Sequence, residues 1–286
     1  MADDAYGSTV AKRRLASRLG AMRLRTGMSL NEVSDKLGWS RGRLDRYERD
    51  EWRLPDASHV RDLARIYEVD DGERAELEDL GRLARERVWW RSFEDVFGKG
   101  NEFAGFENDA ARISVYMPLV LPGLLQSRPY MEALLAVGPW SAEWQERAIA
   151  ARLRRQEILT RTDGTVPRLV VVITEACLLY RWGSAADRVA QLEQLIAVSG
   201  RPNVELRLLR FADGPHPGMS SLIDIFDFPD DADASVVYLE NDTEITEVTK
   251  PADVTAYRET FARIREAALT PAASRTYLTK LSQDQE

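Results

Sequence analysis

Residues 28–48 read MSLNEVSDKLGWSRGRLDRYE, and this stretch decides the fold of the first part of the chain. Ser29, with Glu32 three positions later, forms a capping box that predicts the start of a helix. Gly38 then ends that helix, because glycine adopts the required left-handed conformation at the least cost. Between these ends, three apolar residues fall on one helical face: Leu30, Val33 and Leu37.

A second helix is predicted directly after this turn. Ser40 is expected to cap it, and Leu44 and Tyr47 turn its apolar face back towards the first helix. Gly42 lies inside the predicted helix, where it costs about 1 kcal/mol relative to alanine. Its missing side chain either lets the backbone approach a groove closely or is simply tolerated. The outward side of the helix has three arginines: Arg41, Arg43 and Arg46.

Arginines on an exposed helix have the chemistry for reading DNA. Such a helix fits the major groove, where a guanidinium group bonds O6 and N7 of guanine at once. The alternative is an ordinary helical hairpin with a solvated basic face. We favour DNA binding because the turn, the caps, the apolar spacing and the arginines agree. Arg41, Arg43 and Arg46 are expected on base edges, beside Gly42, and three residues are expected on phosphates: Ser40, Arg49 and Arg53.

Residues 11–70 resemble the lambda-repressor-like, xenobiotic-response-element-type helix-turn-helix domain. The segments 46–49 and 53–55 match the stretch that follows the recognition helix in that family. The resemblance implies a bundle of five helices. Leu30 departs from the family pattern, because a polar residue, often glutamine, usually stands there and contacts a phosphate. That contact must come from the backbone, from a neighbour such as Asn31, or be absent.

Length and composition bound the rest of the chain. With 286 residues, 44% of them hydrophobic and 30% charged, it is long enough for two globular domains. We find neither an apolar run long enough to cross a membrane nor a signal peptide, so a cytoplasmic protein without a membrane partner is expected. With one cysteine, Cys177, and two histidines, we expect no disulfide, no metal and no cofactor.

Charge is distributed unevenly along the chain. The net charge is −8, but residues 9–70 have 14 basic and 10 acidic residues, a net charge of +4. The remaining residues have 25 basic and 37 acidic residues, a net charge of −12. This asymmetry is typical of a basic DNA-binding part joined to an acidic body.

The predicted elements give an α+β fold with two domains, a helix-turn-helix domain at 9–87 and an α+β domain at 88–286. Helices are expected at 10–26 and 71–87, the latter continuing across the junction, and Asp56 is expected to cap a helix between them. The second domain is expected to have helices at 102–116, 128–136, 141–160, 185–199, 251–268 and 271–281. Strands are expected at 167–173, 204–209, 222–228, 235–240 and 244–249.

The second half also resembles a known family. Residues 116–126, which include Leu121, Leu124 and Gln126, are similar to a motif of actinobacterial regulators that join this helix-turn-helix to an uncharacterised C-terminal domain. Further matches are Glu175 with Ala176, residues 202–204, Gly214 with His216 and Gly218, and residues 237–240. The family includes WhiJ-like, antitoxin-like developmental regulators of filamentous bacteria, often encoded beside small partner proteins. What its C-terminal domain binds is not given by the resemblance.

Several residues of the second half are candidates for a ligand or partner site. The loop at 118–125 is unusually apolar and either packs on a core or lines a groove. Glu175 and Glu240 each follow an apolar strand, and His216 lies in a loop between two prolines. The alternative for His216 is a structural role in holding the loop. Together the candidates are Leu121, Leu124, Gln126, Glu175, His216 and Glu240.

The sequence thus predicts a transcription regulator that binds double-stranded DNA as a homodimer. Its dimer interface is expected in the C-terminal half or around residues 89–97. One alternative is an interaction module whose acidic body binds a small, basic protein encoded nearby, with DNA binding secondary. A second is a small-molecule effector in a pocket walled by residues 119–126 and 216–220. An enzymatic C-terminal domain is the weakest alternative, because no P-loop, dinucleotide fingerprint or nucleophile elbow is present.

Overall fold

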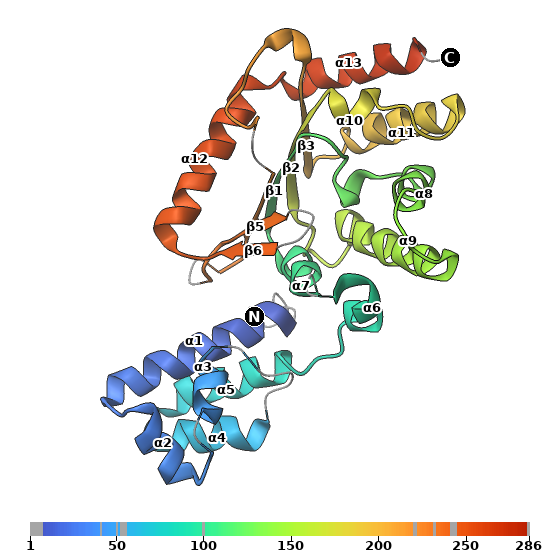
Figure 1. Cartoon of the computed structure of the whole chain (residues 1–286). Helices are drawn as coiled ribbons and strands as arrows, with labels where there is room; N and C mark the ends of the chain where they lie inside the picture. Colours follow the sequence, from blue (N-terminus) through green and yellow to red (C-terminus); the bar gives the residue numbers. More distant parts are fainter. Residues whose placement is uncertain are drawn as a thin grey trace. The chain divides into compact units, whose positions relative to one another are not determined.

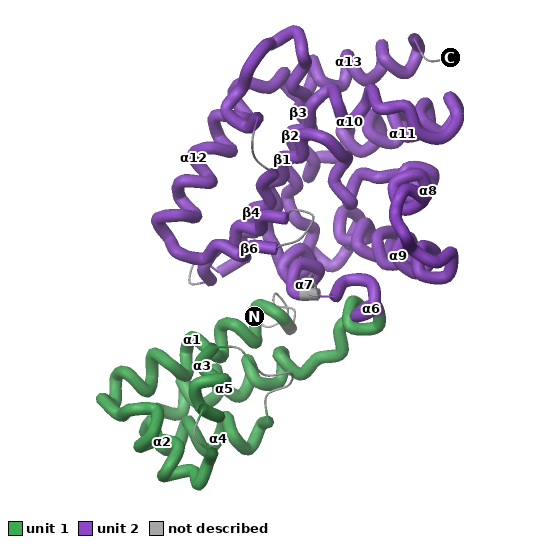
Figure 2. Tube along the Cα trace, viewed as in Figure 1, with its two compact units in different colours: residues 1–92 green, residues 93–286 purple. Residues whose placement is uncertain are grey.

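The chain divides into two compact units, residues 1–92 and residues 93–286 (Figure 2). The computed structural model describes residues 8–40, 42–49, 51, 56–98, 101–219, 222–230, 233–240 and 245–284. Arg41 and Arg53 among the predicted DNA contacts lie outside the described residues, and so does Ser220 of the predicted effector pocket. A short 3₁₀ helix, η1 (Trp89–Phe93), spans the division between the units.

The first unit is a bundle of helices around one apolar core. Its helices, among the described residues, are α1 (Ser8–Thr26), α2 (Leu30–Leu37), α3 (Arg43–Glu48), α4 (Ala57–Ile66) and α5 (Asp71–Leu83) (Figure 1). The core takes one or more fully buried side chains from each of these five helices, among them Leu15, Val33, Leu44, Leu63 and Leu77. Burial of each such leucine contributes about 1.5–3 kcal/mol. The predicted helices are confirmed, but α5 ends at Leu83, because residues 85–87 are exposed and charged and have nothing to bury.

The ends of α2 lie where the sequence predicts them, whereas the start of α3 does not. Ser29 Oγ accepts a hydrogen bond from Glu32 N at 3.2 Å, and Glu32 Oε2 accepts one from Ser29 N at 2.8 Å. Gly38 has a φ of +63°, as the predicted helix end requires. Helix α3 begins at Arg43, after Gly42 with a φ of +81°. The predictions that Ser40 caps α3 and that Gly42 lies inside it are therefore wrong, because a left-handed residue cannot continue a right-handed helix.

The second unit is built on a six-stranded sheet with the order β3-β2-β1-β4-β5-β6. The first three strands are mutually parallel, and β4, β5 and β6 continue the sheet in antiparallel pairs. At the centre, Val115 of β1 lies opposite Val171 of β2 and Asp224 of β4. The strands are β1 (Arg112–Met117), β2 (Arg168–Thr174), β3 (Val204–Leu209), β4 (Ile223–Asp227), β5 (Val236–Glu240) and β6 (Ile245–Val248).

Helices cover both faces of this sheet, with α12 on one side and α8, α9 and α11 on the other (Figure 1). Val254, Phe261 and Ile264 of α12 pack in one cluster with sheet residues such as Val170. On the opposite face, the ring of Phe103 in α7 lies 5.2 Å from the ring of Phe226. The helical segments are α6 (Glu94–Phe97), α7 (Asn101–Asp109), η3 (Gly123–Leu125), α8 (Arg128–Ala136), α9 (Ala142–Gln156), η4 (Glu157–Thr160), α10 (Ala176–Leu179), α11 (Ala185–Val198), η5 (Phe211–Asp213), α12 (Pro251–Ala267) and α13 (Pro271–Gln283).

One predicted element of this unit is wrong. The segment 102–116 was expected to be a single helix, but α7 ends at Asp109 and β1 follows from Arg112. Residues 113–116 are all buried, since β1 lies between two strands and is covered on both faces. A short strand buried on both faces shows no alternation of polar and apolar residues, and its pattern is easily read as helix. The α+β class itself is confirmed.

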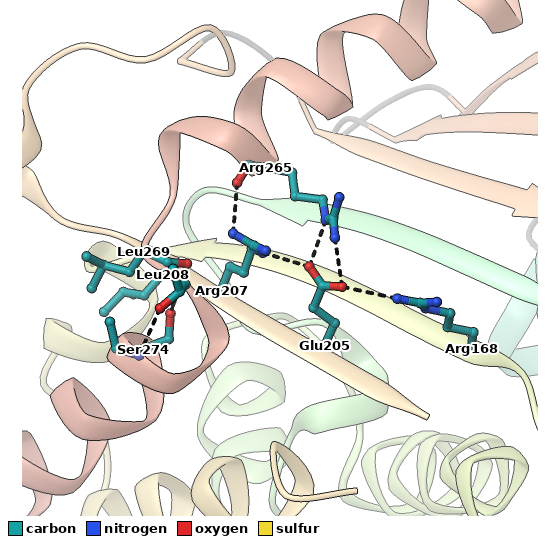
Figure 3. A network of polar contacts seen from close by, with 9 residues as sticks. Arg168, Glu205, Arg207, Leu208, Arg265, Leu269 and Ser274 are labelled. Atoms are coloured by element: carbon teal, nitrogen blue, oxygen red, sulfur yellow. Dashed lines mark hydrogen bonds and ion pairs between the residues drawn. The ribbon is translucent and has the colours of Figure 1, made fainter. Parts of the chain in front are cut away.

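Polar contacts join α12 and α13 to the edge strand β3 (Figure 3). Glu205 accepts hydrogen bonds from Arg265 at 2.7 and 2.9 Å and from Arg207 at 2.6 Å. Arg168 of β2 completes the group at 3.4 Å. Further along the strand, Leu208 N donates to Ser274 Oγ at 3.0 Å. These bonds fix the turn between the last two helices against the sheet.

No helix among the described residues is both long enough and apolar enough to span a membrane.

Candidate nucleic-acid interface

Helix α3 buries one face and presents the other to solvent. Leu44 and Tyr47 are buried in the core of the first unit. Arg46 and Arg49 are exposed on the opposite side. The predicted outward orientation is therefore confirmed for Arg46, whereas Arg43 is half-buried and Arg41 lies outside the described residues. Since the helix has only six residues, its position depends on contacts with its neighbours.

An ion pair fixes the carboxyl end of α3. Glu48 bonds Arg23 of α1 through both carboxylate oxygens, at 2.6 and 2.8 Å, and the two side chains are only 12 and 14% exposed. Arg23 Nη1 also donates to the Met28 carbonyl at 3.0 Å. Donation of these hydrogen bonds to Glu48 raises the pKa of Arg23. One guanidinium group thus joins α1, the start of α2 and the end of α3.

An aromatic cluster joins α3 to the turn before it and to α4. The ring of Trp39, in the turn before α3, lies 5.4 Å from the ring of Tyr47 and 4.8 Å from that of His59 on α4. Tyr47 Oη lies 2.7 Å from His59 Nδ1. Burial raises the pKa of Tyr47 and lowers the pKa of His59. Both groups are therefore neutral near pH 7, and the cluster joins the turn, α3 and α4.

Arg43, at the start of α3, rests on this cluster. Its Cζ lies 4.8 Å from the centre of the Trp39 ring, and its Nη2 lies 3.1 Å from Nε2 and 3.4 Å from Nδ1 of His59. The side chain is half-buried. Nε and Nη1 of Arg43 bond no described residue. The guanidinium group is thus held at Nη2 and on one face, while Nε and Nη1 have no bond to the described residues.

The other predicted DNA contacts are more open. The side chain of Arg46 makes no hydrogen bond or ion pair with any residue that the structure describes. Arg49 pairs with Asp45 at 3.1 Å on the surface, a contact worth little in water. Ser40 and Gly42 are exposed in the turn. The structure therefore brings Ser40, Gly42, Arg43, Arg46 and Arg49 together on α3 and the turn before it.

Sequence reasoning missed the residues that hold α3 in place. Trp39, His59 and Glu48 were not assigned a role, because each acts through a partner on another helix. The one available signal was that aromatic residues stand on both sides of the arginines, at Trp39 and Tyr47. Leu30, where a polar residue was expected, packs partly buried against the core, and Asn31 beside it is exposed. A phosphate contact from Asn31 stays a prediction.

The candidates in the loop after β1 are structural. Leu121 and Leu124 are buried, so this loop packs on the core. Gln126 is buried as well, and its Nε2 donates to the Leu121 carbonyl at 2.6 Å. Gln191 of α11 closes the same loop by donating to the Leu125 carbonyl at 2.8 Å. Of the two alternatives for this segment, the structure favours packing on a core.

The remaining candidates lie apart, and no hydrogen bond or ring contact joins them within the described part of the chain. Glu175 accepts a bond from Phe211 N at 2.5 Å and another from the Tyr277 hydroxyl, which ties the end of β2 to α13. His216 Nδ1 accepts a bond from Gly218 N at 3.2 Å. This bond supports a role in holding the loop, and burial lowers the pKa of His216. Glu240 is exposed at the end of β5.

Other chemistry has little support in the described residues. They contain no group of three His, Cys, Asp or Glu side chains that could hold a metal ion. Cys177 is buried, and burial raises the pKa of its thiol to about 12, so it is not a nucleophile near neutral pH. An open depression of about 390 Å³ lies between β6 and α12, lined by Val248, Asp253, Ala256, Tyr257 and Thr260. None of these lining residues belongs to the predicted effector pocket.

Comparison with known proteins gives two matches that divide the chain in the same way. A family model described as a helix-turn-helix domain matches residues 14–77. A model described as a domain of unknown function, DUF5753, matches residues 101–280, which is more than half of the 286 residues. No curated protein and no solved structure matches the chain.

Proposed function

The chain belongs to the DUF5753 family, and because a helix-turn-helix domain precedes that region, we propose that it is a sequence-specific, DNA-binding transcription regulator. The exposed face of α3 carries the proposal. Arg46 stands there without a side-chain partner among the described residues, and an arginine so placed can bond guanine in the major groove. A place in the cytoplasm and membership of the WhiJ-like, antitoxin-like subfamily belong to the same proposal.

Charge supports the assignment of α3 as the DNA-facing element. Residues 9–70 have a net charge of +4, whereas the rest of the chain has −12. DNA attracts the first and repels the second. Within the first unit, the intramolecular pairs of Arg18, Arg23 and Arg25 with Glu76, Glu48 and Glu73 occupy three arginines of α1. The arginines of α3 are therefore the more available contacts.

The proposal is tested by selecting, from random duplexes, those that the protein binds. The same selection with Arg46→Ala tests whether Arg46 reads a base. We expect one motif to be enriched in the wild type. Arg46→Ala should then lose preference at one base pair by about 1–3 kcal/mol, the value of a bidentate arginine–guanine contact. The matched control is Arg82→Ala, an exposed arginine of α5 that pairs with Asp79 on the same helix and with Glu86 just after it. This control should keep the preference.

Two results would contradict parts of this proposal. Enrichment of no motif would remove sequence-specific binding. Equal weakening of Arg46→Ala on every duplex would make Arg46 a phosphate contact and transfer base reading to another residue.

A regulatory role for the C-terminal unit is the second part of the proposal. Its acidic surplus would attract a small basic protein, and Leu119 and Val120 add exposed apolar surface to this unit. A small-molecule effector is the alternative. Affinity for the selected duplex, measured with the protein encoded next door and then with a metabolite extract, separates these two. We propose no enzymatic step, because Glu175, a candidate carboxylate, is already bonded to Phe211 and Tyr277.

A further inference from the structure

We propose that His59, a residue of α4, is a positioning residue that sets the direction of Arg43 on α3, so that a second helix determines part of the base preference. This inference rests on the proposed function. Its mechanical basis is the contact of the Arg43 guanidinium group with two aromatic rings, one from the turn and one from α4. It adds a residue outside the helix-turn-helix stretch of 28–48 to the set that governs recognition.

The contacts of Arg43 restrain its side chain but leave hydrogen-bond donors available. A guanidinium group has five N–H donors in a rigid plane. The Trp39 ring supports one face of this plane, and His59 contacts it at Nη2, at 3.1 Å. Nε and Nη1 have no bond to a described residue. Nη2 has two N–H groups, and its contact with His59 takes at most one of them. Nη2 can therefore still pair with Nε or with Nη1 to bond O6 and N7 of guanine together.

Restraint before binding improves recognition because a free arginine loses much rotamer freedom when it bonds a base. Arg43 has lost part of that freedom already in the unbound protein, so less is lost on binding. Truncation of His59 removes one side of the support and leaves the Trp39 face. The expected consequence is a weaker and less selective contact of Arg43, with α3 itself still held by Leu44 and by the Arg23–Glu48 pair.

The contact also depends on the charge of His59. Arg43 and Tyr47 face the imidazole ring from α3, and Asp56 and Asp62 act on it from the N-terminal part of α4. Burial and the charge of Arg43 lower the pKa of His59 below its ordinary value of 6.5, and the two aspartates oppose this. Near neutral pH the ring is uncharged and tolerates the guanidinium group. Once protonated, it repels Arg43.

A double-mutant cycle on the full chain tests the positioning role. The probes are the selected duplex and a copy with a single change at the base pair where Arg43→Ala loses preference. His59→Ala should reduce the ratio of the two affinities about tenfold, within the range for one arginine–guanine contact. In the Arg43→Ala background, His59→Ala should not change the ratio of the two affinities any further. His59→Phe keeps an aromatic face for Arg43 and should restore most of the ratio.

The pH profile gives a second, independent readout. Between about pH 7.5 and pH 5, the wild type should lose preference at this base pair as His59 becomes protonated. His59→Phe, which has no titrating group, should keep it. Circular dichroism of each variant identifies any that fails to fold, and His59→Leu, which also removes the ring, then replaces His59→Ala in the cycle.

The possible failures are distinguishable. Additive losses in the cycle, an unchanged ratio in His59→Ala, or uniform weakening of Arg43→Ala on all duplexes would each overturn the positioning role and leave the proposed function intact. A wild type that selects no motif would overturn the proposed function, and this inference with it.

Discussion

At the scale of single residues, the Arg23–Glu48 pair decides where α3 lies. Glu48→Gln leaves the Arg23 guanidinium largely buried opposite a neutral amide. Loss of one partner of a buried pair costs about 3–5 kcal/mol, and the remaining exposure of this pair reduces our expectation to about 2–3 kcal/mol. Native-state hydrogen exchange of the α3 and α1 amides measures this change as a lower opening free energy.

A matched control exists on the same helix. Arg25 pairs with Glu73 of α5 with similar geometry, but the side chains are 55 and 24% exposed. Glu73→Gln should therefore change the opening free energy by less than about 1 kcal/mol. Equal effects of the two substitutions would show that burial does not distinguish the pairs, and α3 would then be held by its apolar face alone.

Residues on one helix were more predictable than contacts between helices. The exposure of Arg46 follows from its spacing relative to Leu44 and Tyr47, because helical periodicity fixes which side chains share a face. The contact of Arg43 with His59 joins α3 to α4, and no local pattern specifies which side chains meet across two helices. The apolar loop residues, Leu121 and Leu124, could be identified as unusual but not as buried, since an apolar segment can line a groove or fill a core.

At the scale of elements, Glu205 joins α12 to the sheet, and this connection should depend on pH. Arg265, which contributes most, and Arg207 lower the pKa of Glu205 from 4.5 to about 2. A lowered pKa means that the carboxylate stabilises the fold above about pH 4.5 and loses this effect as the pH falls towards 2. We expect about 1–2 kcal/mol, after allowance for solvent screening.

Urea unfolding of the wild type and of Glu205→Gln across this pH range measures the effect. The variant should be less stable near neutral pH, because Arg168, Arg207 and Arg265 then lose their shared carboxylate. It should also show a flatter dependence of the free energy of unfolding between pH 4.5 and 2. The control is Glu266→Gln, which changes an exposed carboxylate of α12. Its free energy of unfolding should have the same pH dependence as that of the wild type. A parallel pH dependence in Glu205→Gln would contradict the assignment.

Elements with clear end signals were predicted most accurately. Ser127, Ser184 and Thr270 cap α8, α11 and α13, and each of these helices begins where the sequence places it. Ser40 has the same chemistry but caps nothing, because Gly42 turns the chain before α3 begins. The type of β1 was missed for a different reason. Its partners, β2 and β4, are distant in sequence, and only they make that segment a strand.

At the scale of the whole molecule, the charge distribution distinguishes the part proposed to bind DNA from the rest of the chain. Residues 9–70 have the basic surplus and the exposed helix α3, and the acidic remainder gains nothing from approaching a duplex. The short α3 offers few base-reading side chains, so a single chain can specify only a few base pairs. A second chain would double that number. This limit motivates our proposal that the protein binds DNA as a homodimer.

A homodimer with two-fold symmetry predicts the form of the DNA site. Two α3 helices on one face of the duplex would read an inverted repeat with half-site centres about 10 base pairs, or 34 Å, apart. Insertion of about 5 base pairs between the half-sites places them on opposite faces and should abolish cooperative binding, whereas about 10 base pairs should restore much of it. Sedimentation of the complex should give two chains per duplex. One chain per duplex, on a motif without internal repeat and at undiminished affinity, would make the monomer the functional unit.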